Sequence, residues 1–331
     1  MDPILFIDAS CTFPYDLETY KTRALGGTEA TVVRLAQKLS EKRPVIVAQH
    51  IRRHTTQCGN VTYVPLLENT TNGNFQSIVV LRNFQLSLDI RARCPNVPVW
   101  LWLHDLVTIY LIGYLRKVAK NNIGIITVSD FLKQQIINLK PLDPFLHSFP
   151  NIVRIYNPID DLLVPDNTIY DANTLAFVSS PHKGLNYTLE VFKDIHKQYP
   201  FFELLVTNPG YFKTDTVKLN IPGVKNLGYL NHAENIQLMR KPLCLFYLNN
   251  EYPETFGLVL AEANAVGTPV LTHPLGATPE VLGNHDQLID TSNIEAVTER
   301  LLQWHQGARP IVKANEAFRL STIVKQWEDL L

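Results

Sequence analysis

The chain has 331 residues, of which 46% are hydrophobic and 18% charged, and its formal net charge is −1. This length predicts two domains with sizeable cores, and the ordinary hydrophobic content argues against long disorder. No uncharged apolar run reaches the roughly 18 residues of a membrane span, and residues 1–8 lack the basic segment of a signal peptide, so we expect a cytoplasmic protein. The four cysteines are scattered, which argues against a disulfide framework or a cysteine-rich zinc site.

The near-neutral total hides two oppositely charged halves. Residues 1–155 carry 17 Lys and Arg against 11 Asp and Glu, a net charge of +6, whereas residues 156–331 carry 13 against 20, a net charge of −7. The protein is therefore a basic half joined to an acidic half. Because the charge of +6 is modest and no RNA-binding motif or basic-aromatic tract accompanies it, we expect no nucleic-acid partner.

The first half of the chain alternates short β-rich apolar runs with helix-like segments. Val32, Leu35, Ala36 and Leu39 recur at helical spacing, which predicts an amphipathic helix. In chain order we expect strand 4–8, helix 28–42, strand 45–48, strand 77–81, strand 99–103, helix 106–120, strand 124–128 and helix 130–139. This alternation predicts a parallel sheet with helices on both faces.

The alternation repeats after residues 157–167, whose Pro, Asp and Asn content predicts a linker. We expect strand 175–178, helix 185–198, strand 202–206, strand 244–248, helix 254–266, strand 269–272, helix 294–306 and a last helix within 314–331. Two doubly wound α/β domains in tandem bind ligands at the carboxyl ends of their strands, which we expect to face a central cleft.

Residues 253–270 hold the strongest candidate site. Glu254 and Glu262 are eight residues apart, which is about 12 Å along one helix. This separation exceeds the roughly 5–5.5 Å of the carboxylates in a retaining glycosidase and suits an extended ligand gripped at both ends. Thr255 could cap the helix, Gly257 would let a ligand approach the backbone, and the helix N-terminus attracts phosphate. These features predict a diphosphate flanked by two hydroxyl-binding glutamates; the alternative is an amphipathic helix with two solvated glutamates.

Three other positions carry residue types suited to the same ligand. Gly26 and Gly27 precede the first long helix, where paired glycines allow close approach to phosphate, although a tight turn is the alternative. Lys183 lies in a turn between a strand and a helix and could neutralise a departing diphosphate; the alternative is a solvated lysine. His104 ends a strand at the ligand-binding edge, beside an aspartate, and is either a site residue or a structural histidine.

The run that begins at Glu254 resembles the E-x7-E signature of the retaining glycosyltransferases of family 4, which reads E-(S/T)-F-G-x-x-x-x-E-A-x-A-x-G-x-P-V. The resemblance implies the GT-B fold, in which two Rossmann-like domains face a central cleft. It also implies that Glu254 binds hydroxyls of the donor sugar and that Glu262 binds the ribose of the nucleotide. The rest of this donor-binding segment consists of Thr255, Phe256, Gly257 and Leu258.

Two further segments resemble phosphate-binding parts of the same family. Residues 25–30 resemble its N-terminal glycine loop, and residues 179–184 resemble a turn in which a basic residue, here Lys183, precedes a glycine. Many relatives carry an arginine shortly before this lysine, where this chain has Ser180 or Phe177. The residues that we consider as additional or compensating phosphate contacts are Arg23, Ser180 and His182.

Residues 272–280 resemble the family's loop T-x-x-G-(G/A)-x-x-E. Gly276 would line the donor cleft, and Glu280 is either a site residue or structural. His104 matches a histidine that the family often has near the donor sugar. The resemblance thus gives Glu254, His104 and Lys183 as the catalytic candidates.

The resemblance also implies the domain organisation. Residues 1–156 would form the N-terminal, acceptor-side domain, and residues 157–312 would form the C-terminal domain that binds the nucleotide-sugar donor. Residues 313–331 would form a helix that crosses back to the N-terminal domain, with an ordinary helix on its own domain as the alternative.

We expect a reaction without a metal ion or cofactor, because the chain has neither a D-x-D nor an HExxH motif. The resemblance implies retaining transfer from a UDP- or GDP-sugar to a hydroxyl of a glycan, lipid-linked or other acceptor. Positive charge and helix dipoles would stabilise the departing diphosphate. The alternatives are a GT-B nucleotide-sugar epimerase or phosphorylase, and a non-catalytic nucleotide-sugar binding protein.

On this interpretation the basic half is the acceptor domain, which in many relatives lies against an anionic membrane or a lipid-linked acceptor. We therefore predict salt-sensitive, peripheral contact with the inner face of a membrane. The basic residues that would make this contact are Arg52, Arg53, Arg91, Arg93, Arg116, Lys117 and Lys120.

Overall fold

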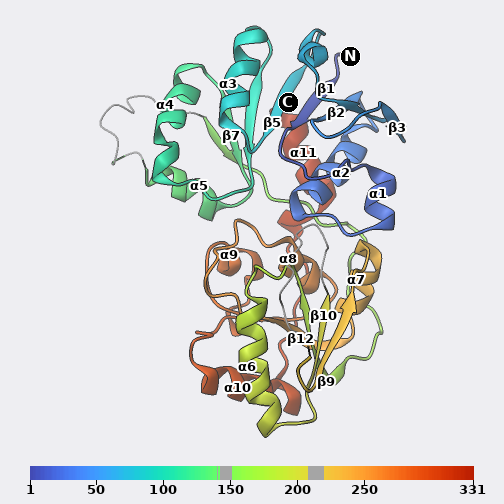
Figure 1. Ribbon diagram of the computed structural model, residues 1–331, viewed down its shortest axis with the longest axis vertical. Coiled ribbons are helices and arrows are strands. Elements are labelled where there is room, and N and C mark those ends of the chain that lie inside the picture. Colours follow the sequence, from blue (N-terminus) through green and yellow to red (C-terminus); the bar gives the residue numbers. More distant parts are fainter. Residues whose placement is uncertain (140, 142–150, 208–219) are drawn as a thin grey trace. The chain divides into compact units, whose positions relative to one another are not determined.

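A computed structural model describes residues 1–139, 141, 151–207 and 220–331. Its internal contacts separate two compact units, which are coloured along the sequence in Figure 1. The first unit consists of Met1–Glu18, Thr28–Pro158 and Leu320–Leu331, and the second unit consists of Thr19–Gly27 and Ile159–Arg319.

The two units depart from the expected domain limits at two places. The chain passes from the first unit to the second after Pro158, two residues beyond the expected boundary at 156. Residues 19–27 were expected in the N-terminal domain, yet they group with the second unit. Tyr20 shows why, because its ring stacks on that of His232, with 5.1 Å between the centroids. Side-chain contacts of this kind link residues far apart in sequence and leave no local pattern.

The first unit is built on an eight-stranded sheet in the order β3-β4-β2-β1-β5-β6-β7-β8. All neighbouring strands are parallel except the β3–β4 pair. The strands are β1 (Ile4–Asp8), β2 (Val45–Gln49), β3 (Thr56–Cys58), β4 (Val61–Pro65), β5 (Ser77–Leu81), β6 (Val99–Leu103), β7 (Gly124–Thr127) and β8 (Ile152–Arg154). Every residue of β1 and β5 is buried, as central strands covered on both faces require.

Helices cover this sheet. α3 packs against β6, and α5 packs against β7 and β8. Asn83 and Ser129 cap these two helices by accepting hydrogen bonds from the backbone of the first turn. The helices and short 3-10 turns are α1 (Leu17–Thr22), α2 (Gly27–Leu39), η1 (Glu68–Thr71), α3 (Phe84–Arg93), η2 (Ile109–Leu111), α4 (Ile112–Lys120), α5 (Asp130–Ile137) and α11 (Leu320–Leu330).

The C-terminal helix α11 belongs to the first unit although the residues before it belong to the second. Its Trp327 ring lies 5.8 Å from that of Phe6 and 4.7 Å from that of Trp102. These three aromatic rings are buried and place α11 in the core that β1 and β6 line. An aromatic cluster of this size buries enough apolar surface to fix the helix there.

The second unit has a five-stranded, fully parallel sheet in the order β11-β10-β9-β12-β13. Its strands are β9 (Asp171–Val178), β10 (Glu203–Thr207), β11 (Val224–Gly228), β12 (Pro242–Tyr247) and β13 (Val270–Thr272). Its helices and helical turns are α6 (Leu185–Gln198), α7 (His232–Met239), α8 (Leu258–Ala265), α9 (Thr278–Leu282), η4 (His285–Gln287), α10 (Ile294–Gln303), η5 (Trp304–Ala308) and η6 (Glu316–Phe318).

Two predicted helices begin later than expected. The helix predicted over 254–266 starts at Leu258, and its N-cap is Gly257 in the left-handed conformation at φ +87°. Glu254 therefore precedes the helix, Thr255 does not cap it, and the spacing of Glu254 and Glu262 along a single helix was wrong. The helix predicted over 106–120 starts as η2 and continues as α4.

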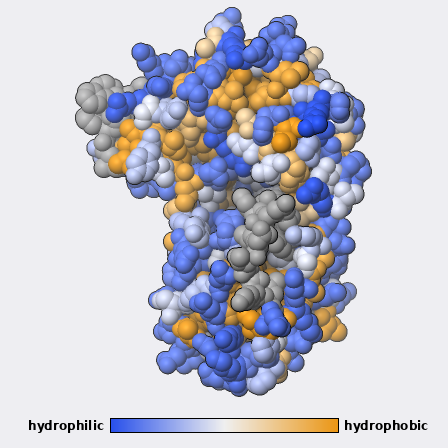
Figure 2. Space-filling model, viewed as in Figure 1, coloured by the Kyte–Doolittle hydropathy of each residue, from blue (hydrophilic) through white to orange (hydrophobic). Residues whose placement is uncertain are grey.

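In the part of the chain that the structure describes, no helix combines the length and apolar character that a membrane crossing requires. On the face shown in Figure 2, hydrophilic residues are interspersed with apolar ones. The predicted α/β class is confirmed for each unit, because both contain a parallel sheet connected by helices.

Candidate active site

Glu254 lies in the second unit between β12 and α8, where a second loop fixes its backbone. Glu254 forms an isolated parallel bridge with Gly276, and the Ala277 N–H donates a 2.8 Å hydrogen bond to the Glu254 carbonyl. Gly276 has φ +68°, and a Cβ there would lie 2.5 Å from the Glu254 carbonyl oxygen. Only glycine lets the two backbones come this close. The fold thus brings together two residues that the sequence predicted for the site.

The Glu254 carboxylate is held by one cation and one phenol. Its Oε1 lies 3.1 Å from the Lys183 Nζ and accepts a 2.5 Å hydrogen bond from the Tyr247 hydroxyl. Among the described residues, none donates a hydrogen bond to Oε2. The side chains of Glu254 and Lys183 are 12% and 27% exposed. This carboxylate is therefore oriented through one oxygen while the other can accept hydroxyl groups of a ligand.

Tyr247 is a site residue that the sequence analysis missed. It is the last residue of β12, and its buried ring stacks on Phe177 with 5.7 Å between the centroids. Burial first, and then the negative charge of Glu254, raise the pKa of Tyr247 well above its usual value of 10.0. The phenol therefore keeps its proton and donates a hydrogen bond to the carboxylate. The one sequence signal was an aromatic residue at the carboxyl end of a predicted strand.

Lys183 sits in a tight turn between β9 and α6. Gly184 is the N-cap of α6 with φ +84°, and a Cβ there would lie 2.9 Å from the Asn249 Cα. The turn therefore packs directly on the loop that follows β12. Ser180 is 1% exposed, and in the described part of the chain its Oγ has no hydrogen-bond partner. A buried hydroxyl without a partner is costly, which supports a ligand contact at this position.

His182 does not supply the positive charge of the arginine that many family 4 enzymes have near this turn. Burial first, and then the neighbouring Lys183, lower the pKa of His182 below its usual value of 6.5, and Glu254 opposes this shift only in part. The ring is therefore neutral near pH 7. Arg23 is exposed and lies in the segment 19–27 of the same unit, where its N–H donates to the Thr19 carbonyl.

Phe256 and Leu258 occupy different environments from each other. Phe256 is 1% exposed, and its ring packs edge-on against Phe318 at 5.1 Å, so the side chain belongs to the core and not to a ligand-facing surface. Leu258 opens α8 and is half-buried. A Cβ on Gly27 would make an ordinary 3.9 Å contact with the Leu258 Cβ, whereas Gly26 is buried. The donor-binding role predicted for Phe256 and Leu258 stays a prediction.

Glu262 lies on α8 and is almost fully buried. Its Oε1 lies 3.6 Å from the Nε2 of His232, the first residue of α7. Asn231 caps α7 in a capping box with Glu234, which fixes the position of His232 at the start of the helix. The sequence analysis missed His232, because its proximity to Glu262 arises only when α7 packs on α8.

Two further candidates are Glu280 and His104. Glu280 is half-buried in the first turn of α9. His104 belongs to the first unit, follows β6, and is buried with its ring 4.6 Å from that of Trp102. Burial first, and then the charge of Arg82, lower the pKa of His104 well below its usual value of 6.5. The imidazole is therefore neutral, so it can form hydrogen bonds but contributes no charge at neutral pH.

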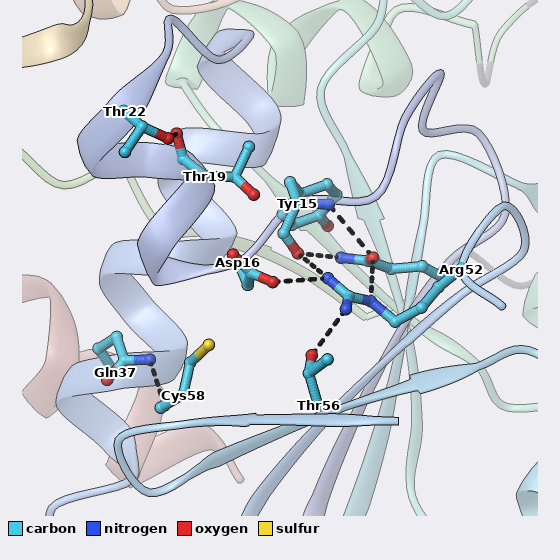
Figure 3. Close-up of polar contacts among 9 residues, drawn as sticks. Tyr15, Asp16, Thr19, Thr22, Gln37, Arg52, Thr56 and Cys58 are labelled. Atoms are coloured by element: carbon cyan, nitrogen blue, oxygen red, sulfur yellow. Dashed lines mark hydrogen bonds and ion pairs between the residues drawn. The ribbon is translucent and has the colours of Figure 1, made fainter. Parts of the chain in front are cut away.

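Arg52 is not part of a basic surface, which corrects one of the predicted membrane contacts. Its Nε donates to the Gln49 Oε1, its Nη1 donates to the Thr56 hydroxyl, and its Nη2 donates to the Tyr15 carbonyl and pairs with Asp16 at 3.0 Å (Figure 3). The side chain is 6% exposed. All three guanidinium nitrogens are used inside the unit, so Arg52 ties β2 to the segment that precedes α1.

No group of three or more His, Cys, Asp or Glu side chains converges on a common point within residues 1–139, 141, 151–207 and 220–331. His50 and His54 are separated by three residues, but they lie in the loop after β2 and not on one helix face.

The segment that contains this site is similar to a known protein family. Residues 170–319, which contain Lys183, Glu254 and Glu262, match the family model described as Glycosyl transferases group 1. The matched segment is a little under half of the chain. It corresponds to most of the second unit, where Lys183, Tyr247 and Glu254 meet.

Curated relatives are also glycosyltransferases. The chain is 26% identical over 194 residues to an uncharacterized glycosyltransferase from Methanocaldococcus jannaschii, a match that covers 57% of this chain and 52% of that protein. It is 24% identical over 303 residues to the gpi3 subunit of phosphatidylinositol N-acetylglucosaminyltransferase from Schizosaccharomyces pombe, covering 78% of this chain and 65% of that protein. The chain thus spans about half to two thirds of the length of these relatives.

The fold is that of GT-B glycosyltransferases. The structure is similar to sucrose-phosphate synthase from Thermosynechococcus elongatus, with a TM-score of 0.70, 14% sequence identity, and coverage of 100% of this chain and 98% of that one. At this identity the likeness establishes the fold alone. It confirms the predicted architecture of two Rossmann-like α/β domains with parallel sheets.

Proposed function

We propose that this protein is a retaining, metal-independent glycosyltransferase of family 4 that moves a sugar from a UDP- or GDP-sugar to an acceptor hydroxyl. The observation that carries the proposal is the cluster of Lys183, Tyr247 and Glu254 at the carboxyl ends of β9 and β12. These ends are where parallel α/β sheets bind nucleotides. The cluster pairs a cation suited to a diphosphate with a carboxylate suited to sugar hydroxyls.

Each residue has a distinct role in the proposed reaction. Glu254 binds donor-sugar hydroxyls through Oε2, while Tyr247 keeps its other oxygen in place. Lys183 neutralises the negative charge that develops on the departing diphosphate, and the N-termini of α6 and α8 add their dipoles. Glu262 binds the ribose.

The phosphate departs and the acceptor hydroxyl attacks on the same face of the sugar ring. The bond from the anomeric carbon to the phosphate oxygen breaks, and the bond to the acceptor oxygen forms on the same side. The acceptor hydroxyl passes its proton to the departing phosphate oxygen. Glu254 positions the donor and forms no covalent intermediate. His104, a neutral imidazole, contributes a hydrogen bond rather than charge.

The decisive experiment measures transfer from UDP- and GDP-sugars by Glu254→Gln and Lys183→Ala. We expect each variant to lose activity by about 100-fold or more while its melting temperature stays near that of the parent protein. The matched control is Lys225→Ala, which breaks an exposed 2.6 Å pair with Glu203 in the same unit. Near-normal turnover by both site variants would refute the site assignment.

The finer parts of the proposal have separate tests. NMR of the product identifies the anomer, and an inverted anomer would refute retention. Transfer that survives exhaustive treatment with a chelator supports metal independence, whereas loss restored by a divalent cation would refute it. Donor incubated without acceptor identifies an epimerase by its epimer and a phosphorylase by its phosphate chemistry. Donor binding without transfer to any acceptor in a panel would identify a binding protein.

We also propose that the protein is cytoplasmic and contacts an anionic membrane through its first unit. α4 carries exposed Arg116, Lys117 and Lys120, and the preceding 3-10 turn exposes Ile109 and Tyr110 by 55% and 90%. Basic side chains next to exposed apolar ones are typical of peripheral membrane contacts. A lipid-linked acceptor fits the phosphatidylinositol named for one relative.

Co-sedimentation with anionic liposomes tests this contact. We expect binding at low salt that weakens as ionic strength rises, and a marked loss in a variant with Lys117 and Lys120 both changed to Ala. Neutral phosphatidylcholine liposomes serve as the control surface. Equal binding to both kinds of liposome, or none to anionic ones at low salt, would contradict the proposal.

A further inference from the structure

Three charged side chains, one buried and two half-buried, pair in the first unit where β1, β5 and α2 meet. The Arg82 Nη2 lies 3.2 Å from the Asp8 Oδ1 and 3.4 Å from the Glu29 Oε1. Asp8 is fully buried, and the side chains of Arg82 and Glu29 are 15% and 14% exposed. None of the three was predicted from the sequence. One guanidinium thus bridges the end of a central strand and the first turn of α2.

The backbone of Arg82 is held in a conformation that an L-residue rarely adopts. Arg82 directly follows β5 and has φ +59°, and its N–H donates a 2.9 Å hydrogen bond to the Trp102 carbonyl of β6. Glycine would adopt this conformation without strain. A side chain kept here despite a cost of about 1 kcal/mol or more indicates that the guanidinium itself is needed.

Burial disfavours the ionised form of Glu29 by more than the nearby charges favour it, so its pKa lies above the usual value of 4.5. Burial is the largest effect on its pKa and raises it, the Arg82 guanidinium lowers it, and Asp8 raises it. Asp8 also accepts hydrogen bonds from the Tyr15 hydroxyl and the Ser10 N–H, so its charge is stabilised separately. The other titratable or charged groups that face this cluster are Cys11, His104 and Asp105. Glu29 is therefore a carboxylate that does not stabilise the fold by its charge.

The position of Glu29 on α2 indicates what its ion pair with Arg82 does. Glu29 lies in the first turn of α2, two residues after Gly27, and α2 begins at that glycine. We propose that Arg82 is a positioning residue: its ion pair with Glu29 holds the first turn of α2, and with it the Gly26–Gly27 loop, in the conformation that receives the donor. This inference rests on the proposed function and on the prediction from the sequence that the glycine loop contacts the donor.

The charge pair makes a sharp prediction for a mutant cycle measured at about pH 6 and about pH 9. In Arg82→Gln, ionised Glu29 faces Asp8 without a cation. We expect the donor KM to rise about tenfold at the higher pH, and to rise less as protonation removes the charge of Glu29. Glu29→Gln should raise KM only about threefold, without lowering the melting temperature. The double variant should return to the Glu29→Gln value at both pH values, and Arg82→Lys should keep most of the activity.

The matched control is Lys42→Gln, which breaks an exposed 2.9 Å pair with Glu328 in the same unit and should change neither KM nor its pH dependence. An Arg82→Gln defect that is equal at both pH values, or that Glu29→Gln fails to relieve, would overturn the proposal. If Arg82→Gln does not fold, an unchanged donor KM in Glu29→Gln would overturn it instead.

Amide hydrogen exchange separates this inference from the proposed function. In the unliganded protein, Arg82→Gln should speed exchange at residues 31–33, whose N–H groups bond the carbonyls of the first turn of α2, beyond the intrinsic effect of pH, and the double variant should restore protection. This readout needs no donor. A parent protein without transferase activity would refute the proposed function while leaving the exchange result interpretable, and unaltered exchange in Arg82→Gln would refute the positioning role alone.

Discussion

Both units place a carboxylate next to a cation at the carboxyl ends of parallel strands, but they use the pair differently. In the second unit, the side chains of Glu254 and Lys183 are 12% and 27% exposed and sit on loops shaped by glycines. In the first unit, Asp8 is fully buried beside Arg82, whose side chain is 15% exposed. Among the described residues none donates to the second oxygen of Glu254, whereas both carboxylate oxygens of Asp8 accept hydrogen bonds inside the unit, from Ser10, Tyr15 and Arg82. A carboxylate near a sheet edge therefore indicates a binding site only where one of its oxygens has no partner inside the protein.

The largest effect is expected for Arg52, whose three guanidinium nitrogens all form hydrogen bonds inside the unit. Arg52→Ala removes three guanidinium nitrogens that bind Gln49, Thr56, Tyr15 and Asp16, and we expect it to lower the free energy of unfolding by about 3 kcal/mol. Lys117→Ala, an exposed change in the same unit, should alter it by less than about 0.5 kcal/mol. Urea unfolding measures both. Equal losses of unfolding free energy in the two variants would contradict the conclusion that buried Arg52 stabilises this unit more than exposed Lys117 does.

The next largest effect tests why the second unit needs a glycine at position 276. In Gly276→Ala the new Cβ would meet the Glu254 backbone at 2.5 Å and the φ of +68° would be strained, so we expect a loss of about 2 kcal/mol of stability. Gly113→Ala on α4 is the control, because nothing lies within 4 Å of its Cβ position and alanine favours a helix. Thermal unfolding of both variants checks this, and a stable Gly276→Ala would contradict the close approach.

Tyr247→Phe tests whether the Glu254 carboxylate needs its phenol. The variant removes the hydrogen bond to Oε1 and leaves the ring stacked on Phe177. We expect transfer to fall about tenfold, or about 1.4 kcal/mol, with little change in melting temperature. Steady-state kinetics with the nucleotide sugar provide the measurement. Full activity in Tyr247→Phe would show that Lys183 alone orients the carboxylate.

The smallest effect concerns the pH dependence of stability. Since the pKa of His104 is lowered in the folded protein, the unfolded chain takes up a proton below about pH 6.5 that the folded one does not. Stability is therefore lost as the pH falls through that value. Relative to His104→Gln, the parent protein should lose about 0.7 kcal/mol between about pH 7 and about pH 6. If the melting temperatures of the two proteins change with pH in the same way, His104 is charged and exposed, which would contradict the prediction.

Much of the fold and part of the site followed from local patterns. The alternating apolar runs located the sheet strands, and the glycines at 184, 257 and 276 marked turns that now prove to need positive φ. Lys183 and Glu254 were both predicted for the site, and they do pair. Such features are readable because periodicity and glycine conformation depend on neighbouring residues.

Other parts of the site could not be read from the sequence. Gly257 ends the extended segment before α8, so Glu254 pairs with Gly276 and is not on a helix. Phe256 matches the family signature, yet its ring fills a gap beside Phe318 in the core. In both cases a contact distant in sequence decided the outcome.

The sequence by itself determined two parallel α/β units, a polar cluster in the acidic half and the unequal charges of the halves. Only the tertiary structure decided which charges remain available. Arg52 and Arg82 look like any other arginines in a basic half, but both pair with carboxylates that other segments of the chain supply. The reason is physical: a net charge is a sum over composition, whereas desolvation and pairing depend on which segments the sheet order brings together.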